Sequence, residues 1–215
     1  MAPYPMTTSQ NIPTPTVATN STLGIVLAGG KSSRMGRDKA ALCIDGEPLL
    51  LRARQQLLAA GCGQVLMSGA PRAEWPETSI ADALPETGPV GGIISTLHWV
   101  RQHAPASSAL LFIPVDAPLL SPALLHDMLI TADTDGCRLD QSPLPLVIKP
   151  TDRVLNRCAA ILSDLQSGRS CSIKHLIAPL DLVTYPMTNV IKSQLINVNT
   201  PTEWEGLCRE LENRT

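Results

Sequence analysis

The 215-residue sequence predicts one α/β domain with a Rossmann-like, mostly parallel sheet and helices on both faces. Three observations lead to this fold class. Strand-like apolar runs alternate with helix-like segments along most of the chain. The apolar runs are continuous, which is typical of strands buried on both faces. Hydrophobic residues make up 44% of the chain, which is enough to fill a sizeable core.

The first 21 residues differ in composition from the rest. Residues 1–21 carry no charged side chain, are rich in Thr, Ser, Asn and Pro, and show no hydrophobic period. Such a segment has too little apolar surface to offset the entropy of ordering, so a disordered tail is expected, and a recruiting tail is the less frequent alternative. Residues 22–215 are expected to form the folded domain.

The order of elements follows from periodicity and from turn residues. Six short apolar runs are expected to be strands; they are 22–28, 40–44, 64–69, 109–116, 143–149 and 193–200. Five segments have helical spacing or helix-terminal residues; they are 48–61, 88–103, 121–132, 151–168 and 201–211.

Individual residues fix several of these boundaries. Pro48 can open a helix in its first turn, and Ser121 followed by proline is a strong N-cap signal. Gly61 and Gly168 stand where helices should end. Asp45-Gly46 favours a tight turn between two short strands.

Charge and cysteine content narrow the function. The formal charge of −2 argues against bulk capture of nucleic acid or of an anionic membrane. The six cysteines include no C-x-x-C pair, so reduced, mostly buried thiols are expected rather than a thiolate metal site. No apolar run is long enough to span a membrane, and no signal peptide is recognisable. A cytoplasmic protein is therefore expected, and any anion site should be local.

The best candidate for an anion site is the stretch LAGGKSSRMGRDK at 27–39, directly after the first apolar run. Gly29 and Gly30 allow backbone amides to approach a ligand and to form a concave anion site. Four cations follow within ten residues, which suits a triphosphate. The stretch matches neither the Walker loop nor the dinucleotide fingerprint. A solvated surface turn is the structural alternative.

The residues LAGGKSSRMGRDKAAL resemble the signature loop L-x-G-G-x-x-x-R-M-G-x-D-K of nucleotidyltransferases that activate sugars and cofactors. The whole form is most similar to the molybdenum cofactor guanylyltransferases. Four further stretches match in the right order, and the resemblance covers about residues 23–211; they are IAD at 80–82, GPVGGI at 88–93, PVDAPLLSPALL at 114–125 and NVNTPTEW at 197–204. It implies a fold of the nucleotide-diphospho-sugar transferase type.

The resemblance also implies a reaction. In that family GTP and molybdenum-bearing molybdopterin combine, a guanylyl group is transferred, and pyrophosphate leaves. The product is molybdopterin guanine dinucleotide. Expected partners are GTP, molybdenum-molybdopterin and other proteins of molybdenum cofactor synthesis, and the expected cofactor is Mg²⁺.

Nucleotide-binding residues carry over by position. The resemblance implies backbone contacts from Leu27, Ala28 and Gly29, together with Gly30, and it implies that Asp82 helps to hold the nucleotide. Without the resemblance, Asp82 is equally well explained by hydrogen bonding within a turn.

Three residues carry over as catalytic. Arg34 and Lys39 would neutralise the phosphates, and Asp116 would bind magnesium as well as the nucleotide. Nucleotidyl transfer builds negative charge on phosphate oxygens, so positive charge is needed where it develops. Magnesium prefers one or two carboxylates plus water and phosphate oxygens. Asp116 could instead cap the next helix, but Ser121 already supplies that cap.

The second substrate is implied to lie near Gly92, Asn197 and Asn199. For Gly92, helix-entry geometry explains the glycine nearly as well. Asn197 and Asn199 are two positions apart and so would share one face of a strand. Hydrogen bonding within a loop is an equal alternative for both.

Two positions depart from the family pattern. Ser68 stands where an asparagine contributes to nucleotide binding, and Ser142-Pro143 replaces a His-Pro pair. A CTP-dependent molybdopterin cytidylyltransferase and a sugar-phosphate nucleotidyltransferase are the alternatives within the enzyme class. A non-catalytic nucleotide-binding protein is the alternative outside it, and it should have lost the charged loop or Asp116.

Overall fold

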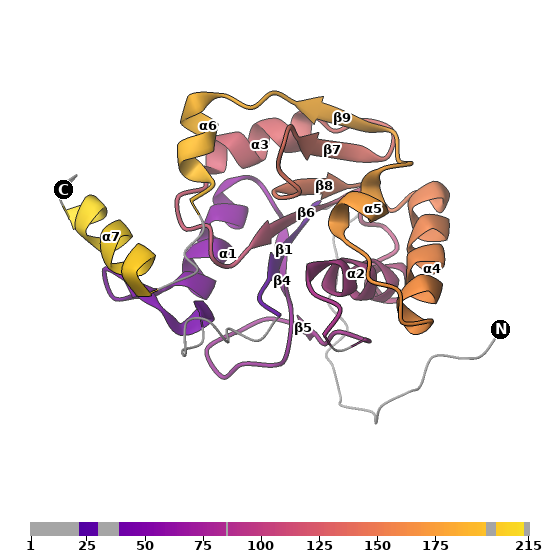
Figure 1. Ribbon diagram of the computed structural model, residues 1–215, viewed down its shortest axis with the longest axis horizontal. Helices are drawn as coiled ribbons and strands as arrows, with labels where there is room; N and C mark the ends of the chain where they lie inside the picture. Colours follow the sequence, from indigo (N-terminus) through magenta and orange to yellow (C-terminus); the bar gives the residue numbers. More distant parts are fainter. Residues whose placement is uncertain (1–21, 30–38, 85, 197–200, 213–215) are drawn as a thin grey trace.

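The computed structural model describes residues 22–29, 39–84, 86–196 and 201–212 (Figure 1). The tail expected at 1–21 lies outside the described residues. So do four site residues predicted from the sequence, which are Gly30, Arg34, Asn197 and Asn199. No helix in the described ranges is long and apolar enough to cross a membrane.

A five-stranded sheet in the order β5-β4-β1-β6-β8 forms the centre of the molecule. Its strands are β5 (Ser79–Ile80), β4 (Gln64–Ser68), β1 (Thr22–Leu27), β6 (Ala109–Pro114) and β8 (Leu146–Ile148). β1 is parallel to β4 and β6, and β4 is parallel to β5, whereas β8 is antiparallel to β6. The mostly parallel sheet predicted from the sequence is confirmed.

The three inner strands end at the same level. Leu27 at the end of β1 lies opposite Ser68 of β4 and Pro114 of β6. The Ala28 N–H donates to the Ser68 carbonyl at 2.9 Å, and the Val115 N–H donates to the Leu27 carbonyl at 3.2 Å. The loops that follow these strands therefore start from one edge, which is where open parallel sheets bind ligands.

Helices cover both faces of this sheet (Figure 1). On one face lie α1 (Leu49–Ala59) and α3 (Pro122–Thr131). On the other lie α2 (Pro89–His103), α4 (Asp152–Gln166) and α5 (Ile173–Ile177). The helical segments expected at 48–61, 88–103, 121–132 and 151–168 are confirmed to within a few residues at their ends.

The alternation of side chains along β1 divides the core into two layers. Ile25 is fully buried and packs in the layer that contains Leu97 of α2 and Val154 of α4. Val26 is also fully buried, and it packs in the layer that contains Leu57 of α1 and Leu125 of α3. Burial on both faces explains why the strand has a continuous apolar sequence.

The helix signals in the sequence act as expected. The Ser121 hydroxyl accepts the Leu124 N–H at 3.2 Å, and the Thr151 hydroxyl accepts the Val154 N–H at 3.3 Å. Gly61 and Gly168 have φ of 100° and 82°, which is the left-handed conformation that glycine supplies at a helix end.

A small second sheet was missed by the sequence analysis. β7 (Gly136–Leu139) and β9 (Leu182–Tyr185) pair in parallel with each other. β7 packs beside β8, because the Lys149 N–H donates to the Asp135 carbonyl at 2.9 Å. A Cβ at Gly136, where φ is 139°, would collide with the Val147 carbonyl oxygen, so this approach requires glycine.

The strand expected at 40–44 is wrong in its first half. Lys39–Ala41 form a 3-10 turn (η1) that the Leu42 N–H closes onto the Lys39 carbonyl at 3.1 Å. Only β2 (Cys43–Ile44) is extended, and it pairs with β3 (Glu47–Pro48). The predicted turn between them is present, because Asp45 and Gly46 both have positive φ, of 53° and 78°.

The strand expected at 193–200 is also wrong where it can be compared. Ser193 and Gln194 belong to α6 (Asn189–Gln194), which begins where the Thr188 hydroxyl accepts the Ile191 N–H at 3.2 Å. Residues 197–200 lie outside the described part. The last helix, α7 (Pro201–Glu212), is confirmed. The strand expected at 109–116 ends two residues early, at Pro114.

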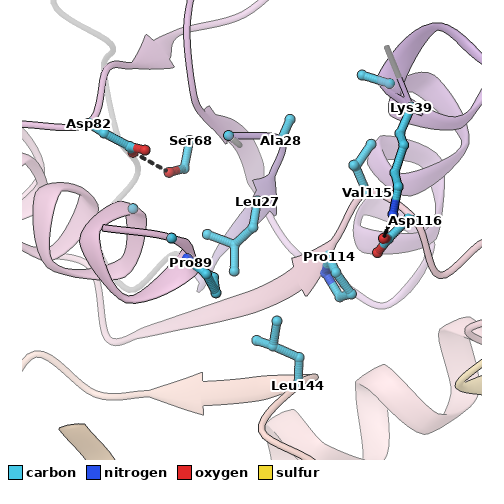
Figure 2. Close-up of a pocket in the computed structure, with 14 residues that line it drawn as sticks. Leu27, Ala28, Lys39, Ser68, Asp82, Pro89, Pro114, Val115, Asp116 and Leu144 are labelled. Carbon is cyan, nitrogen blue, oxygen red and sulfur yellow. Dashed lines mark hydrogen bonds and ion pairs between the residues drawn. The ribbon is translucent and has the colours of Figure 1, made fainter. Parts of the chain in front are cut away.

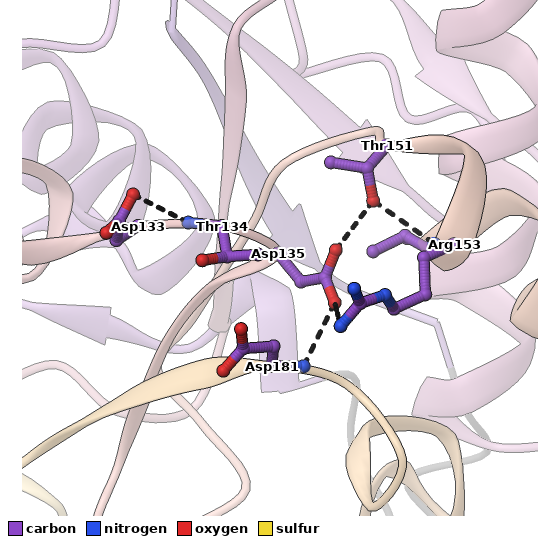
Figure 3. A network of polar contacts seen from close by, with 7 residues as sticks. Asp133, Thr134, Asp135, Thr151, Arg153 and Asp181 are labelled. Atoms are coloured by element: carbon purple, nitrogen blue, oxygen red, sulfur yellow. Dashed lines mark hydrogen bonds and ion pairs between the residues drawn. The ribbon is translucent and has the colours of Figure 1, made fainter.

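One buried carboxylate joins β7, α4 and the segment before β9 (Figure 3). The Asp135 side chain is 1% exposed. Its Oδ1 accepts from the Thr151 hydroxyl at 2.7 Å, and its Oδ2 accepts from the Asp181 N–H at 2.9 Å. Arg153 contributes an ion pair at 3.4 Å. A buried carboxylate with this many donors fixes the position of β7 against the main domain.

We predict that Asp135→Asn lowers the free energy of unfolding by about 1–3 kcal/mol, because the amide leaves one buried donor without an acceptor. Urea denaturation measures this change. Asp133→Asn is the matched control, since Asp133 is exposed and its Oδ1, which accepts the Thr134 N–H, is kept in the amide. Equal stability of the two variants would show that Asp135 is not a structural anchor.

Candidate active site

A pocket of about 250 Å³ opens at the carboxyl edge of the sheet (Figure 2). The ends of β1, β4 and β6 form its centre, α2 begins at one side of it, and η1 lies at the other. Seven residues predicted from the sequence line it; they are Leu27, Ala28, Gly29, Lys39, Asp82, Gly92 and Asp116. The fold thus brings together residues that are up to 89 positions apart in the chain.

The strand ends approach each other very closely. A Cβ at Gly69, where φ is 143°, would lie 3.2 Å from the Ala28 carbonyl carbon and 3.1 Å from the Gly29 nitrogen. A Cβ at Gly29 would lie 3.0 Å from Oδ2 of Asp82. Glycine therefore lets a carboxylate and backbone meet at the mouth of the pocket, where a larger residue would fill the space.

One end of the pocket carries an acceptor pair, Ser68 and Asp82. The Ser68 hydroxyl donates to Oδ1 of Asp82 at 3.4 Å, and Ser68 is 1% exposed. Burial raises the pKa of Asp82, and the hydrogen bond from Ser68 partly offsets that rise. The Ala83 N–H donates to the Ser95 hydroxyl of α2 at 3.0 Å, which anchors the loop. This end can accept hydrogen bonds from the base or ribose of a nucleotide.

The other end carries an ion pair. Nζ of Lys39, at the start of η1, lies 2.7 Å from Oδ2 of Asp116, and the two side chains are only 17% and 18% exposed. Figure 2 shows this pair across the pocket from Ser68 and Asp82, with Leu27 and Ala28 between. A partly desolvated lysine and carboxylate interact more strongly than an exposed pair.

Asp116 is not a helix cap. Ser121 caps α3, and Asp116 stands two residues beyond β6, where it faces the pocket. The carboxylate is thus positioned for a ligand rather than for backbone capping.

The N-terminus of α2 faces the same pocket. Gly88, with φ of 67°, precedes Pro89 at the first helical turn, and both line the pocket together with Gly92. A 15-residue helix presents partial positive charge at this end, which favours a phosphate. A Cβ at Gly92 would collide with the Ser68 hydroxyl and lie 3.3 Å from Oδ1 of Asp82. Gly92 therefore packs against the acceptor pair.

The pocket wall offers few ligands for a metal ion. Within the described residues no group of three or more His, Cys, Asp or Glu side chains could enclose an ion. Asp116 offers one carboxylate on the pocket wall. That suits Mg²⁺, which takes one or two carboxylates and completes its shell with water and substrate phosphates, better than it suits a metal that needs an all-protein cage.

Two residues that line the pocket were not predicted as site residues from the sequence. Ser68 was noted only as a departure from a family pattern, although its place at the end of β4, opposite Leu27, could have pointed to the pocket. Leu144, which precedes β8, closes the apolar side with Pro114 (Figure 2). Nothing in the sequence around Leu144 indicates that it lines the pocket.

A parallel sheet whose edge combines close-packed glycines, a helix N-terminus and a lysine–aspartate pair is suited to bind a nucleotide and its phosphates. The family model described as the MobA-like NTP transferase domain matches residues 24–176. The chain belongs to this family.

Known relatives agree with that assignment. The molybdenum cofactor guanylyltransferase of Xanthomonas euvesicatoria pv. vesicatoria is 35% identical over 87% of this chain and 94% of its own. The molybdenum cofactor guanylyltransferase of Rhizobium meliloti is 35% identical over 83% of this chain and 87% of its own. The structure of molybdopterin-guanine dinucleotide biosynthesis protein A from Archaeoglobus fulgidus covers 90% of this chain and 100% of its own, with a TM-score of 0.67 and 18% identity. The predicted family and the predicted type of fold are confirmed.

We predict that Gly92→Ala weakens nucleotide binding about tenfold or more, because the methyl group would displace Ser68 or Asp82. Isothermal titration with GTP measures the dissociation constant. Gly206→Ala is the matched control: Gly206 is also helical, but a Cβ there meets nothing within 4 Å. Unchanged GTP affinity in Gly92→Ala would place the nucleotide away from the acceptor pair.

Proposed function

We propose that the protein transfers the GMP moiety of GTP to molybdenum-molybdopterin and releases pyrophosphate, giving molybdopterin guanine dinucleotide. The observation that carries the proposal is the Lys39–Asp116 ion pair in one pocket with the Ser68–Asp82 acceptor pair. The guanylyltransferase names of the relatives support the same reaction.

The nucleotide lies along the carboxyl edge of the sheet. Its base and ribose occupy the end at Ser68 and Asp82, where a hydroxyl and a carboxylate accept hydrogen bonds. Backbone groups of Leu27, Ala28 and Gly29 follow the nucleotide toward its phosphates. The phosphates then reach toward Lys39 and Asp116 at the other end of the pocket, where the ammonium group of Lys39 favours negative charge.

Lys39 and Asp116 act where bonds change. An oxygen of the acceptor phosphate attacks the α-phosphorus of GTP, and the bond to the oxygen that bridges to the β-phosphorus breaks. The electron pair leaves with pyrophosphate, and Lys39 neutralises the charge that grows on the leaving oxygens. Arg34 contributes further positive charge to the triphosphate. Asp116 holds Lys39 on this side of the pocket before the nucleotide arrives.

The cofactor in this proposal is Mg²⁺, held by Asp116. Nucleotidyltransferases generally use a divalent metal, which when bound supplies positive charge to the phosphates without proton transfer. We also propose that Asn197 and Asn199 contact the second substrate, molybdenum-molybdopterin. The six cysteines are free thiols, which supports the proposal that the reaction takes place in the cytoplasm.

The direct test offers the enzyme magnesium, molybdenum-loaded molybdopterin and each of the four nucleoside triphosphates in turn. We predict that GTP releases pyrophosphate and yields the dinucleotide, and that ATP, CTP and UTP do so at least about tenfold more slowly, which corresponds to about 1.4 kcal/mol of discrimination. Preference for CTP would identify a cytidylyltransferase on the same fold. No pyrophosphate with any nucleotide would identify a non-catalytic nucleotide-binding protein.

A further inference from the structure

The Asp116 loop, residues 115–121, joins β6 to α3 and carries one of the residues that act in the proposed reaction. Ala117 and Leu120 of this loop are each 2% exposed and belong to the core layer that contains α1 and α3. Asp116 itself is only partly buried, and it lines the active-site pocket. The place of its carboxylate therefore depends on the contacts that fix the loop around it.

Gln56 of α1 contacts this loop from inside the core. Its side chain is 8% exposed, and its Nε2 donates to the Pro118 carbonyl at 2.9 Å and to the Leu120 carbonyl at 2.8 Å. One amide group thus bridges two carbonyls that are two residues apart, which restricts the turn that the chain makes directly after Asp116. Buried hydrogen bonds of this kind hold a single backbone geometry.

Packing alone does not explain a glutamine at position 56. Its Oε1 has no hydrogen-bond partner among the residues that the structure describes. An unpaired buried acceptor lowers stability, because it loses its hydration and gains no partner. A methionine would fill a similar volume beside Ala53 and Leu57 without that cost. The two hydrogen bonds that Nε2 donates to the loop account for the amide.

A second glutamine holds the far end of the same loop. Oε1 of Gln194 on α6 accepts the Ser121 N–H at 2.9 Å, and the Gln194 side chain is half-buried. Ser121 is also the N-cap of α3. The chain that follows Asp116 is therefore anchored by side chains from two different helices, α1 and α6.

The helix that carries Gln56 also supports Lys39. η1 packs against α1, and the Leu49 N–H at the start of α1 donates to the Leu42 carbonyl at 2.8 Å. Ala40 of η1 is 1% exposed in the same core layer. One helix thus holds both sides of the ion pair, although Lys39 and Asp116 are 77 positions apart in the chain.

We propose that Gln56 is a positioning residue for guanylyl transfer, with Gln194 as the second anchor. From α1, Gln56 fixes the Asp116 loop so that the carboxylate stays within 2.7 Å of Nζ of Lys39 and faces the phosphates. A catalytic group held in advance needs no rearrangement when the substrates arrive. This inference rests on the proposed function and adds to it two residues that do not line the pocket.

The test uses the full-length enzyme with saturating Mg·GTP and molybdenum-loaded molybdopterin. Gln56→Met should slow single-turnover transfer about tenfold, because a small displacement of a catalytic group has a large effect on rate. The dissociation constant for GTP should stay within about twofold of the wild-type value, because the groups that hold the nucleotide before reaction are unchanged. Hydrogen exchange of residues 115–121, measured without substrates, should become faster.

A double variant separates positioning from other roles. Adding Gln56→Met to Asp116→Asn should cause little further loss of rate, because Gln56 acts through the Asp116 carboxylate.

Gln55→Gly is the matched control. Gln55 is the exposed neighbour of Gln56 on α1, and glycine there weakens the same helix through backbone entropy. This variant should keep the wild-type rate and the wild-type exchange in the loop. Gln194→Met removes the second anchor from a half-buried position and should also slow transfer at unchanged GTP affinity. It keeps the inference testable if thermal melting shows that Gln56→Met does not fold.

The possible results are distinct. A wild-type rate in Gln56→Met, or equal slowing in Gln56→Met and Gln55→Gly, overturns the inference and leaves the proposed function standing. Fully additive losses in the double variant also overturn it, since Gln56 would then act independently of Asp116. Absence of transfer by the wild-type enzyme with every nucleotide overturns the proposed function, and the positioning role with it.

Discussion

The register of β1 between β4 and β6 is the constraint on which the site depends. Leu27, Ser68 and Pro114 lie at one level because β4 pairs in parallel with Leu23–Leu27 and β6 pairs in parallel with Thr22–Leu27. A shift of one residue would turn Ile25 and Val26 toward the wrong core layers, and each layer is built of buried apolar side chains. The hydrophobic core therefore fixes where the polar strand ends meet.

The polar and charged side chains of the pocket form two groups at opposite ends of this sheet edge. The acceptor pair Ser68 and Asp82 lies on the β4 side, and Lys39 with Asp116 lies on the β6 side. A nucleotide with a polar base at one end and phosphates at the other matches that division. Ser68 is buried, and burial also raises the pKa of Asp82, so hydrogen bonds made at this end are worth more than in water.

Local signals predicted much of this arrangement. The apolar run of β1, the N-cap Ser121 and the candidate carboxylate Asp116 could all be read from neighbouring residues. The β7–β9 pair could not, because it joins four-residue strands 46 positions apart and its register depends on Gly136 approaching β8. The contact of Ser68 with Asp82 likewise depends on folding of distant segments rather than on any motif.

The central claim is that Lys39 and Asp116 act as one catalytic unit, in which the carboxylate of Asp116 positions both Mg²⁺ and the ammonium group of Lys39 on the phosphates. Single-turnover rates for Lys39→Ala, Asp116→Asn and the double variant at saturating Mg·GTP test it most directly. The account predicts that each single change slows transfer about a hundredfold, or about 3 kcal/mol, and that the double variant is little slower than either. Fully additive losses would contradict the claim, because they would show that the two residues act independently. Near-normal rates in the single variants would also contradict it, because neither residue would then be needed for transfer.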